Sequence, residues 1–269
     1  MEPIATTKWL KEHLHDPNLI ILDASTEGSA DGSKKSDRTE MIPCARWFDL
    51  KGVFSDATSV FPNTLPTVAQ FEEGCQNLGI SNHHKIVIYD HFGVYSSPRV
   101  WWLFKVMGHK SVAVLDGGLP EWKAQGYKTV PTMGANYYKG NFKANFQPEL
   151  IIKLDDVKDN IKHPDFLIVD ARSSGRFNGT ESEPRAHLKS GHIPNSVNIP
   201  YQEVLDGTHF KDKSTLKDLF NQRCYGKKNL VFSCGSGLTA CIVMLASNLS
   251  YSDSQRIYDG SWTEWAQSS

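Results

Sequence analysis

The chain repeats itself, and this repeat limits its possible folds more than any other feature. Four segments of the first half recur in the same order in the second half: LIILDAS (19–25) as FLIVDARS (166–173), MIPCARWFDL (41–50) as HIPNSVNIPY (192–201), KIVIYDHFGVYSSPRV (85–100) as NLVFSCGSGLTACIV (229–243), and VLDGGLPEWKAQG (114–126) as IYDGSWTEWAQ (257–267). The separation of about 145 residues is too long for a solenoid repeat. The sequence therefore predicts two copies of one domain.

The stretch between the two copies sets the expected domain boundaries. Residues 130–150, VPTMGANYYKGNFKANFQPEL, have no clean apolar period and contain several turn-forming residues, which is typical of a connection. We therefore expect a first domain over 1–130, a linker over 131–148 and a second domain over 149–269.

Each copy alternates short β-branched runs with helical patterns. In the second copy the runs 166–170, 229–233 and 255–259 read as strands, and 214–223 and 238–249 read as helices. This alternation predicts an α/β fold in which each domain is an open, mainly parallel sheet with helices on both faces. In such sheets ligands bind beyond the carboxyl ends of the strands.

Composition excludes several classes of function. Of the 269 residues 39% are hydrophobic and 22% charged, which is ordinary for a globular protein, and the net charge of −1 favours neither nucleic acid nor a membrane surface as a partner. The N-terminus carries no pattern of a secretory signal. Five cysteines without CxxC spacing indicate neither a disulfide framework nor a metal site. We expect a reducing compartment, with the cytosol favoured and the mitochondrion as the alternative.

One cysteine lies on a glycine-rich turn between a strand and a helix. Cys234 follows the run NLVFS and precedes Gly-Ser-Gly and a second apolar run. Backbone N–H groups can converge on one point in such a turn, and the start of the helix adds unsatisfied N–H groups and a positive dipole end. A sulfur at that point is favoured as the thiolate, which is the nucleophilic form.

A cysteine at a strand end can also be a small buried hydrophobe. The first copy carries Asp90 at the matching position, so the fold itself does not require cysteine there. The other four thiols, Cys44, Cys75, Cys224 and Cys241, lack this setting, and we interpret them as structural.

Several motifs together resemble those of two-domain rhodanese-type sulfurtransferases. The chain has paired IP motifs, two DGxxxxW endings and the loop CGSGLTA (234–240). That loop, together with GRFNGTESEPR (175–185) and SSPRVWWLF (96–104), resembles the 3-mercaptopyruvate branch of the family. The thiosulfate branch, which has a loop of the C-R-K-G type, is the alternative.

The resemblance implies a covalent mechanism that needs neither a metal nor an organic cofactor. The Cys234 thiolate would attack the sulfur of 3-mercaptopyruvate, release pyruvate and keep a persulfide. Thioredoxin, a small thiol or cyanide would then take the outer sulfur, and hydrogen sulfide can follow.

The same resemblance assigns the residues of the site. It implies that Arg176 and Arg185 bind the substrate carboxylate, because guanidinium groups hold carboxylates bidentately; without it, both arginines read as solvated loop residues. Further substrate contacts are implied for the loop residues Gly235, Gly237, Leu238 and Thr239. We interpret Arg172 and His192 as structural.

A Ser-His-Asp relay used in this branch is incomplete here. Ser236 and Asp49 match its serine and aspartate, but Asn63 stands where the histidine is expected. An amide cannot serve as a general base. We therefore expect either another proton carrier, with His91 as a candidate, or a relay that is not essential.

We also consider two hypotheses that belong to other functional classes. A cysteine phosphatase of related fold needs an arginine six residues after the cysteine, and Ala240 occupies that position. A non-catalytic binding module fits the first copy, whereas the complete Cys234 loop argues against it for the whole chain.

Overall fold

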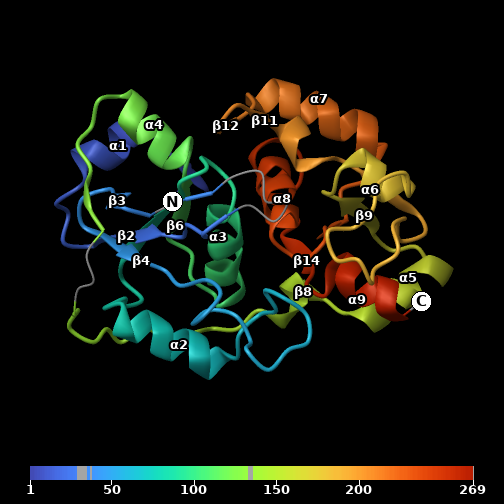
Figure 1. Cartoon of the computed structure of the whole chain (residues 1–269), viewed down its shortest axis with the longest axis horizontal. Coiled ribbons are helices and arrows are strands. Elements are labelled where there is room, and N and C mark those ends of the chain that lie inside the picture. Colours follow the sequence, from blue (N-terminus) through green and yellow to red (C-terminus); the bar gives the residue numbers. More distant parts are fainter. Residues whose placement is uncertain (29–34, 37, 133–135, 269) are drawn as a thin grey trace. The chain divides into compact units, whose positions relative to one another are not determined.

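The computed structural model describes residues 1–28, 35–36, 38–132 and 136–268 (Figure 1). The chain divides into two compact units. The first contains residues 1–58 and 65–147, and the second contains residues 148–269 together with the six residues 59–64.

The first unit is built on a five-stranded parallel sheet. Its order is β1 (Ile4–Ala5), β6 (Val112–Leu115), β5 (Lys85–Tyr89), β2 (Leu19–Asp23) and β4 (Ala45–Trp47). Every residue of β2 is buried, as expected for a parallel strand that is covered on both faces. A separate small antiparallel sheet joins β3 (Glu40–Met41) to β7 (Val130–Pro131).

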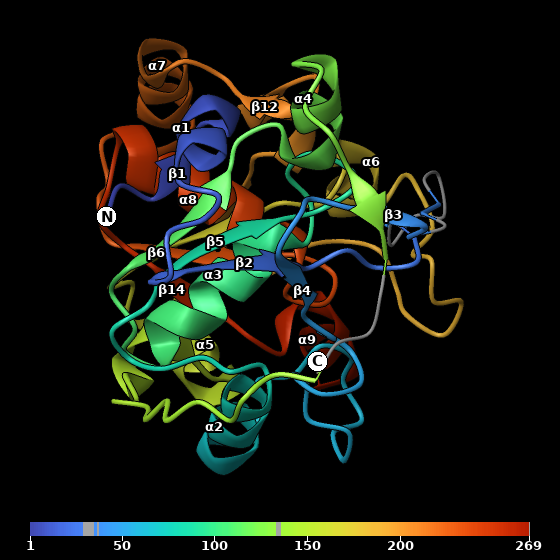
Figure 2. The ribbon, with the colours of Figure 1, turned by 90° about the vertical axis from the view of Figure 1, so that its left-hand side faces the viewer.

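Among the described residues of this unit, four helices cover the two faces of the sheet. They are α1 (Thr7–Glu12), α2 (Val68–Asn77), α3 (Ser97–Val106) and α4 (Gly118–Ala124). Figures 1 and 2 show α1 and α4 on one face and α2 and α3 on the other. Leu10 and Trp122 belong to the core on the first face. On the opposite face the rings of Phe71 and Phe104 meet edge to face, with centroids 5.1 Å apart.

The second unit repeats the same architecture. Its parallel sheet has the order β10 (Ser196–Asn198), β9 (Leu167–Asp170), β13 (Leu230–Ser233), β14 (Arg256–Tyr258) and β8 (Ile151–Ile152). A short antiparallel pair joins β11 (Leu205–Asp206) to β12 (His209–Phe210).

The helices of the second unit are α5 (Leu154–Lys162), α6 (Ser174–Asn178), α7 (Lys213–Cys224), α8 (Thr239–Ser250) and α9 (Ser261–Ser268), with 3-10 turns at Pro148–Leu150 and Tyr201–Val204. Val157 of α5 and Trp262 of α9 share one core cluster with the sheet, and Figure 1 shows α7 and α8 on the other face. The predicted fold class is confirmed, and the strands and helices expected in the second copy form close to their predicted bounds.

The segment expected as the linker packs along the first unit, although residues 133–135 lie outside the described residues. Phe142 is completely buried. The N–H of Gly140 donates to the carbonyl of Gln76 at 2.8 Å, and that of Gln147 donates to Val106 at 2.8 Å. The apolar side chain and the backbone bonds tie this stretch to α2 and α3.

None of the described helices combines the length and the apolar character needed to cross a membrane.

Candidate active site

Cys234 lies directly after β13, at the carboxyl end of a central strand, and α8 begins five residues later. Its side chain is 1% exposed. The start of α9 holds its backbone, because the N–H of Cys234 donates to Ser261 Oγ at 3.4 Å and its carbonyl accepts from the N–H of Trp262 at 2.9 Å. The thiol is therefore fixed at the edge of the sheet where α/β proteins bind ligands.

The turn after Cys234 presents unused hydrogen-bond donors. The backbone N–H groups of Gly235, Ser236, Leu238 and Thr239 donate to no acceptor among the described residues. Gly237 takes a φ of +77°, a conformation that glycine adopts without strain. Free N–H groups at the start of a helix favour an anion.

The first unit shows what the matching loop does with an anion. Asp90 is fully buried. Its Oδ1 accepts from the N–H of Phe92 at 2.9 Å, and its Oδ2 accepts from the N–H groups of Tyr95, Ser96 and Ser97 at 2.8–3.0 Å. The Ser97 hydroxyl adds a bond of 2.7 Å. The loop thus surrounds a carboxylate of its own chain, at the position where the second unit carries a thiol.

Arg176 lies against the cysteine loop. A Cβ placed on Gly235 would come within 2.8 Å of Arg176 Nη2, so the missing side chain leaves the room that the guanidinium occupies. Glu183 holds this arginine in a bidentate pair, with bonds of 3.0 Å from Nε and 2.6 Å from Nη2. Glu183 also accepts from Arg172 Nη1 at 2.7 Å.

Arg172 has the structural role that the sequence predicts. It is 1% exposed, bonds to Asp170 at 2.7 Å, and lies over the ring of Trp262. His192 is likewise stacked on Phe177 and bonded to its carbonyl. Two arginines and two carboxylates alternate in the network of Asp170, Arg172, Glu183 and Arg176, so the charge of Arg176 is already balanced.

Arg185 differs from Arg176 because it has no carboxylate partner among the described residues. Its Nη1 donates to Thr263 Oγ1 at 3.0 Å, and that hydroxyl donates in turn to the carbonyl of Gly235 at 2.5 Å. Its positive charge is therefore available to a ligand near the cysteine loop.

Ser236 is bonded by the residue that replaces the expected histidine. Asn63 Nδ2 lies 3.1 Å from the carbonyl oxygen of Ser236 and 3.2 Å from its hydroxyl oxygen. Asn63 adopts a left-handed φ of +58°, which asparagine tolerates better than most residues. The asparagine thus serves as a donor to Ser236 rather than as a base.

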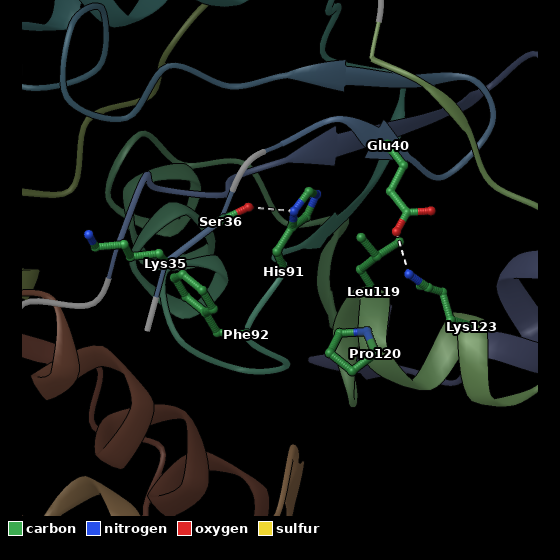
Figure 3. A pocket seen from close by; sticks show the side chains of 8 residues that line it. All are labelled: Lys35, Ser36, Glu40, His91, Phe92, Leu119, Pro120 and Lys123. Atoms are coloured by element: carbon green, nitrogen blue, oxygen red, sulfur yellow. Dashed lines mark hydrogen bonds and ion pairs between the residues drawn. The ribbon is translucent and has the colours of Figure 1, made fainter. Parts of the chain in front are cut away.

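The other relay candidates belong to the first unit. Asp49 Oδ1 accepts from the N–H of Gly52 at 2.9 Å and caps a turn; its catalytic role stays a prediction. His91 lines a pocket of about 580 Å³ (Figure 3). Its Nδ1 lies 2.7 Å from Ser36 Oγ, and its Nε2 lies 3.4 Å from Asp23 Oδ2.

The remaining thiols lack the setting of Cys234. Burial raises the pKa of Cys75 well above its usual range and raises the pKa of Cys224 to about 12. Cys241 is buried in α8 and donates to the carbonyl of Gly237 at 3.3 Å. Cys44 alone of the four is exposed, in a turn with a φ of +66°.

Sequence reasoning did not single out Glu183 or Thr263. The repeat carried one usable signal for Thr263, because the first copy has Pro120 at the matching position in DGGLPEW. For Glu183 there was none, since its partners become visible only when β9, α6 and the following loop come together. Within the described residues no group of three or more His, Cys, Asp or Glu could hold a metal ion.

Comparisons with known proteins agree with this architecture. The rhodanese-like domain family model matches residues 6–125 and 153–268. The Arabidopsis thaliana protein named thiosulfate/3-mercaptopyruvate sulfurtransferase 1, mitochondrial, is 39% identical over 98% of this chain and 76% of its own length. Human 3-mercaptopyruvate sulfurtransferase is 37% identical over 97% of this chain and 91% of its own length.

A solved structure shows the same fold over nearly the whole chain. The crystal structure of the Escherichia coli 3-mercaptopyruvate sulfotransferase SseA superposes with a TM-score of 0.84 and 32% identity, and covers 97% of this chain and 99% of the other.

Proposed function

Because the chain belongs to the rhodanese-like family, we propose that it is a 3-mercaptopyruvate sulfurtransferase whose sulfur carrier is Cys234. The second domain is the catalytic one, and the first lacks the reactive cysteine. The observation that carries the proposal is the pair of matching loops. In one the N–H groups surround the Asp90 carboxylate, and in the other unused N–H groups follow a thiol.

The first half-reaction forms a persulfide. The Cys234 thiolate attacks the sulfur of 3-mercaptopyruvate, so that a sulfur–sulfur bond forms while the carbon–sulfur bond breaks. The departing carbon keeps the electron pair as the enolate of pyruvate and then takes up a proton. The N–H groups of the loop stabilise the anionic sulfur before and after this transfer.

Arg185 and Arg176 orient the donor. Arg185 supplies uncompensated positive charge, and Arg176 supplies N–H donors from a position fixed by Glu183. Together they hold the carboxylate so that the sulfur at the other end of the three-carbon donor points to Cys234. The path of the donor to Cys234 is lined by backbone groups and uncharged side chains of the loop residues Gly235, Gly237, Leu238 and Thr239.

Ser236 contributes a hydroxyl to the donor. Since Asn63 donates to its oxygen, the hydroxyl hydrogen can be directed to the carbonyl oxygen of the keto acid. The proton needed by the enolate then comes from the substrate thiol or from water, because no histidine occupies the position of Asn63.

The second half-reaction returns the thiolate. A thiol acceptor such as thioredoxin or a small thiol attacks the outer sulfur of the persulfide, and attack by a second thiol on the product releases hydrogen sulfide. Five cysteines without a disulfide fit a reducing compartment, the cytosol or the mitochondrial matrix.

The second candidate donor is thiosulfate, which the name of the Arabidopsis relative includes. Thiosulfate is a compact dianion, and a loop that binds it gains from cationic side chains beside the sulfur. Residues 235–239 carry no charged side chain, which favours the keto acid.

A direct test compares the two donors with one acceptor. We expect a higher kcat/KM for 3-mercaptopyruvate, stoichiometric pyruvate release, and a mass increase of one sulfur that maps to Cys234. A persulfide on another cysteine, or a preference for thiosulfate, would contradict the proposal.

A further inference from the structure

Thr263 joins the substrate arginine to the cysteine loop. The residue is 2% exposed. Its hydroxyl donates to the carbonyl of Gly235 at 2.5 Å and accepts from Arg185 Nη1 at 3.0 Å, while its N–H donates to the same carbonyl at 3.3 Å. One buried side chain therefore contacts both the loop and the arginine.

Comparison with the first copy shows which of these hydrogen bonds occur in both domains. The N–H of Leu119 donates to the carbonyl of Asp90 at 3.0 Å, matching the 2.9 Å bond from Trp262 to Cys234. Pro120 follows Leu119, and Figure 3 shows its ring at the edge of the first-unit pocket. Proline has neither an N–H nor a hydroxyl, so the bridge occurs only in the copy that carries the cysteine.

Arg185 depends on this bridge for its position. It lies in a segment without helix or strand between α6 and β10, and Thr263 is its only side-chain partner in the described part of the chain. A carboxylate partner would neutralise the guanidinium, as Glu183 does for Arg176. A hydroxyl holds it in place and leaves its charge for the ligand.

We propose that Thr263 is a positioning residue that fixes the Arg185 guanidinium relative to the Cys234 loop and thereby favours donors with a carboxylate at a set distance from the transferred sulfur. This inference rests on the proposed function, because it assigns the carboxylate of the donor to Arg185.

The test replaces Thr263 by Val, which keeps the volume and the backbone N–H but removes the hydroxyl. We expect KM for 3-mercaptopyruvate to rise about fivefold to tenfold, as for the loss of one intramolecular hydrogen bond, with kcat changed far less. Turnover of thiosulfate, which has no carboxylate, should change less than twofold. Thr263→Ser should restore the wild-type values.

Ser261→Ala is the matched control, since it removes the other α9 hydroxyl from the loop without touching Arg185. It should affect both donors by the same factor. In an Arg185→Gln background, Thr263→Val should have no further effect on 3-mercaptopyruvate, because the residue would have nothing left to position.

Pyruvate binding, measured by calorimetry, separates this inference from the proposed function because it needs no turnover. Its dissociation constant should rise about fivefold to tenfold in a folded Thr263→Val protein. An unchanged constant, equal losses for both donors, or failure of Thr263→Ser to rescue would overturn the role of Thr263. A wild-type protein that binds pyruvate in this way but forms no persulfide from 3-mercaptopyruvate would instead refute the proposed function.

Discussion

The loops after β5 and β13 have the same position in the fold, but their backbone N–H groups differ in whether they have a hydrogen-bond acceptor. In the first unit the loop N–H groups are occupied by Asp90, which is buried and accepts from three consecutive residues. In the second unit Cys234 takes that place, and the loop N–H groups of Gly235, Ser236, Leu238 and Thr239 have no acceptor among the described residues. The comparison teaches that the fold provides a site for an anion. In the first unit Asp90 fills this site, and under the proposed function the anionic sulfur of Cys234 fills it in the second.

The helices that follow the next strand reinforce this difference. Both α4 and α9 donate a backbone N–H to the residue at the loop start. Only α9 adds a hydroxyl that reaches an arginine. The copy that carries Cys234 therefore differs from the other in the residue at the loop start and in a hydroxyl that joins the loop to an arginine.

The largest effect should come from removing the thiol. Cys234→Ser should abolish persulfide formation, because a serine hydroxyl is a far weaker nucleophile at neutral pH. Intact mass after treatment with 3-mercaptopyruvate measures the loss. Cys44→Ser is the matched control, since Cys44 is the exposed thiol, and it should still gain one sulfur. A sulfur retained on Cys75 or Cys241 in the Cys234→Ser protein would break the comparison between the loops.

The reciprocal change removes the internal anion. Asp90→Ala should destabilise the first unit by at least about 3 kcal/mol, because several buried donors lose a charged acceptor, and should lower its melting temperature by roughly 10 °C. Asp212→Ala is the control, since that carboxylate caps α7 at the surface, and its removal should lower stability much less. Equal effects of the two changes would show that the N–H groups around Asp90 contribute little.

The two arginines should not be equivalent. Arg185→Gln should lower kcat/KM for 3-mercaptopyruvate about 30-fold to 100-fold, because no carboxylate in the described part of the chain compensates its charge. Arg176→Gln should cost nearer tenfold, since Glu183 already balances that charge. Both losses should be smaller with thiosulfate. Losses of the same size for both donors would indicate a structural role for the arginines.

A change of loop chemistry should shift donor preference. Gly235→Arg with Ser236→Lys should raise thiosulfate turnover and lower that of 3-mercaptopyruvate, changing the ratio of kcat/KM values at least about tenfold. A side chain at position 235 would also contact Arg176. The double variant therefore adds charge to the loop and displaces the Arg176 guanidinium as well. Ser236→Lys alone is the control that leaves Arg176 in place. An unchanged ratio in the double variant would mean that loop charge does not select the donor.

The smallest expected effect concerns the two structural thiols whose pKa burial raises. Cys224 has a raised pKa of about 12 in the folded protein, and Cys75 is shifted in the same direction by burial. In the unfolded chain these thiols lose their protons near pH 9, so stability should be retained below that pH and should fall as pH rises toward 12. The loss should approach about 1.4 kcal/mol per pH unit for each thiol. Urea midpoints at pH 8 and pH 10 measure it, and Cys75→Ala should flatten the difference.

Part of the candidate site could be predicted from the sequence because it depends on residues that are close together in the chain. The position of Cys234 between a strand and a helix, and its replacement by Asp90 in the other copy, follow from patterns within a few residues. The sequence predicted only part of the contribution of Asn63. Its chemistry excluded a general base, but its role as a donor to Ser236 depends on a contact across 173 positions.

By itself the sequence determined the number of copies, the strand and helix pattern of each, and which copy has a cysteine in the glycine-rich loop. These properties follow from hydrophobic periodicity and turn chemistry, which act over one element at a time. Only the tertiary structure decided that residues 59–64 fold with the second unit, that Glu183 balances Arg176, and that Thr263 reaches Arg185 across 78 positions. Such contacts arise when packed elements bring distant side chains to within a hydrogen bond, and no local pattern records that distance.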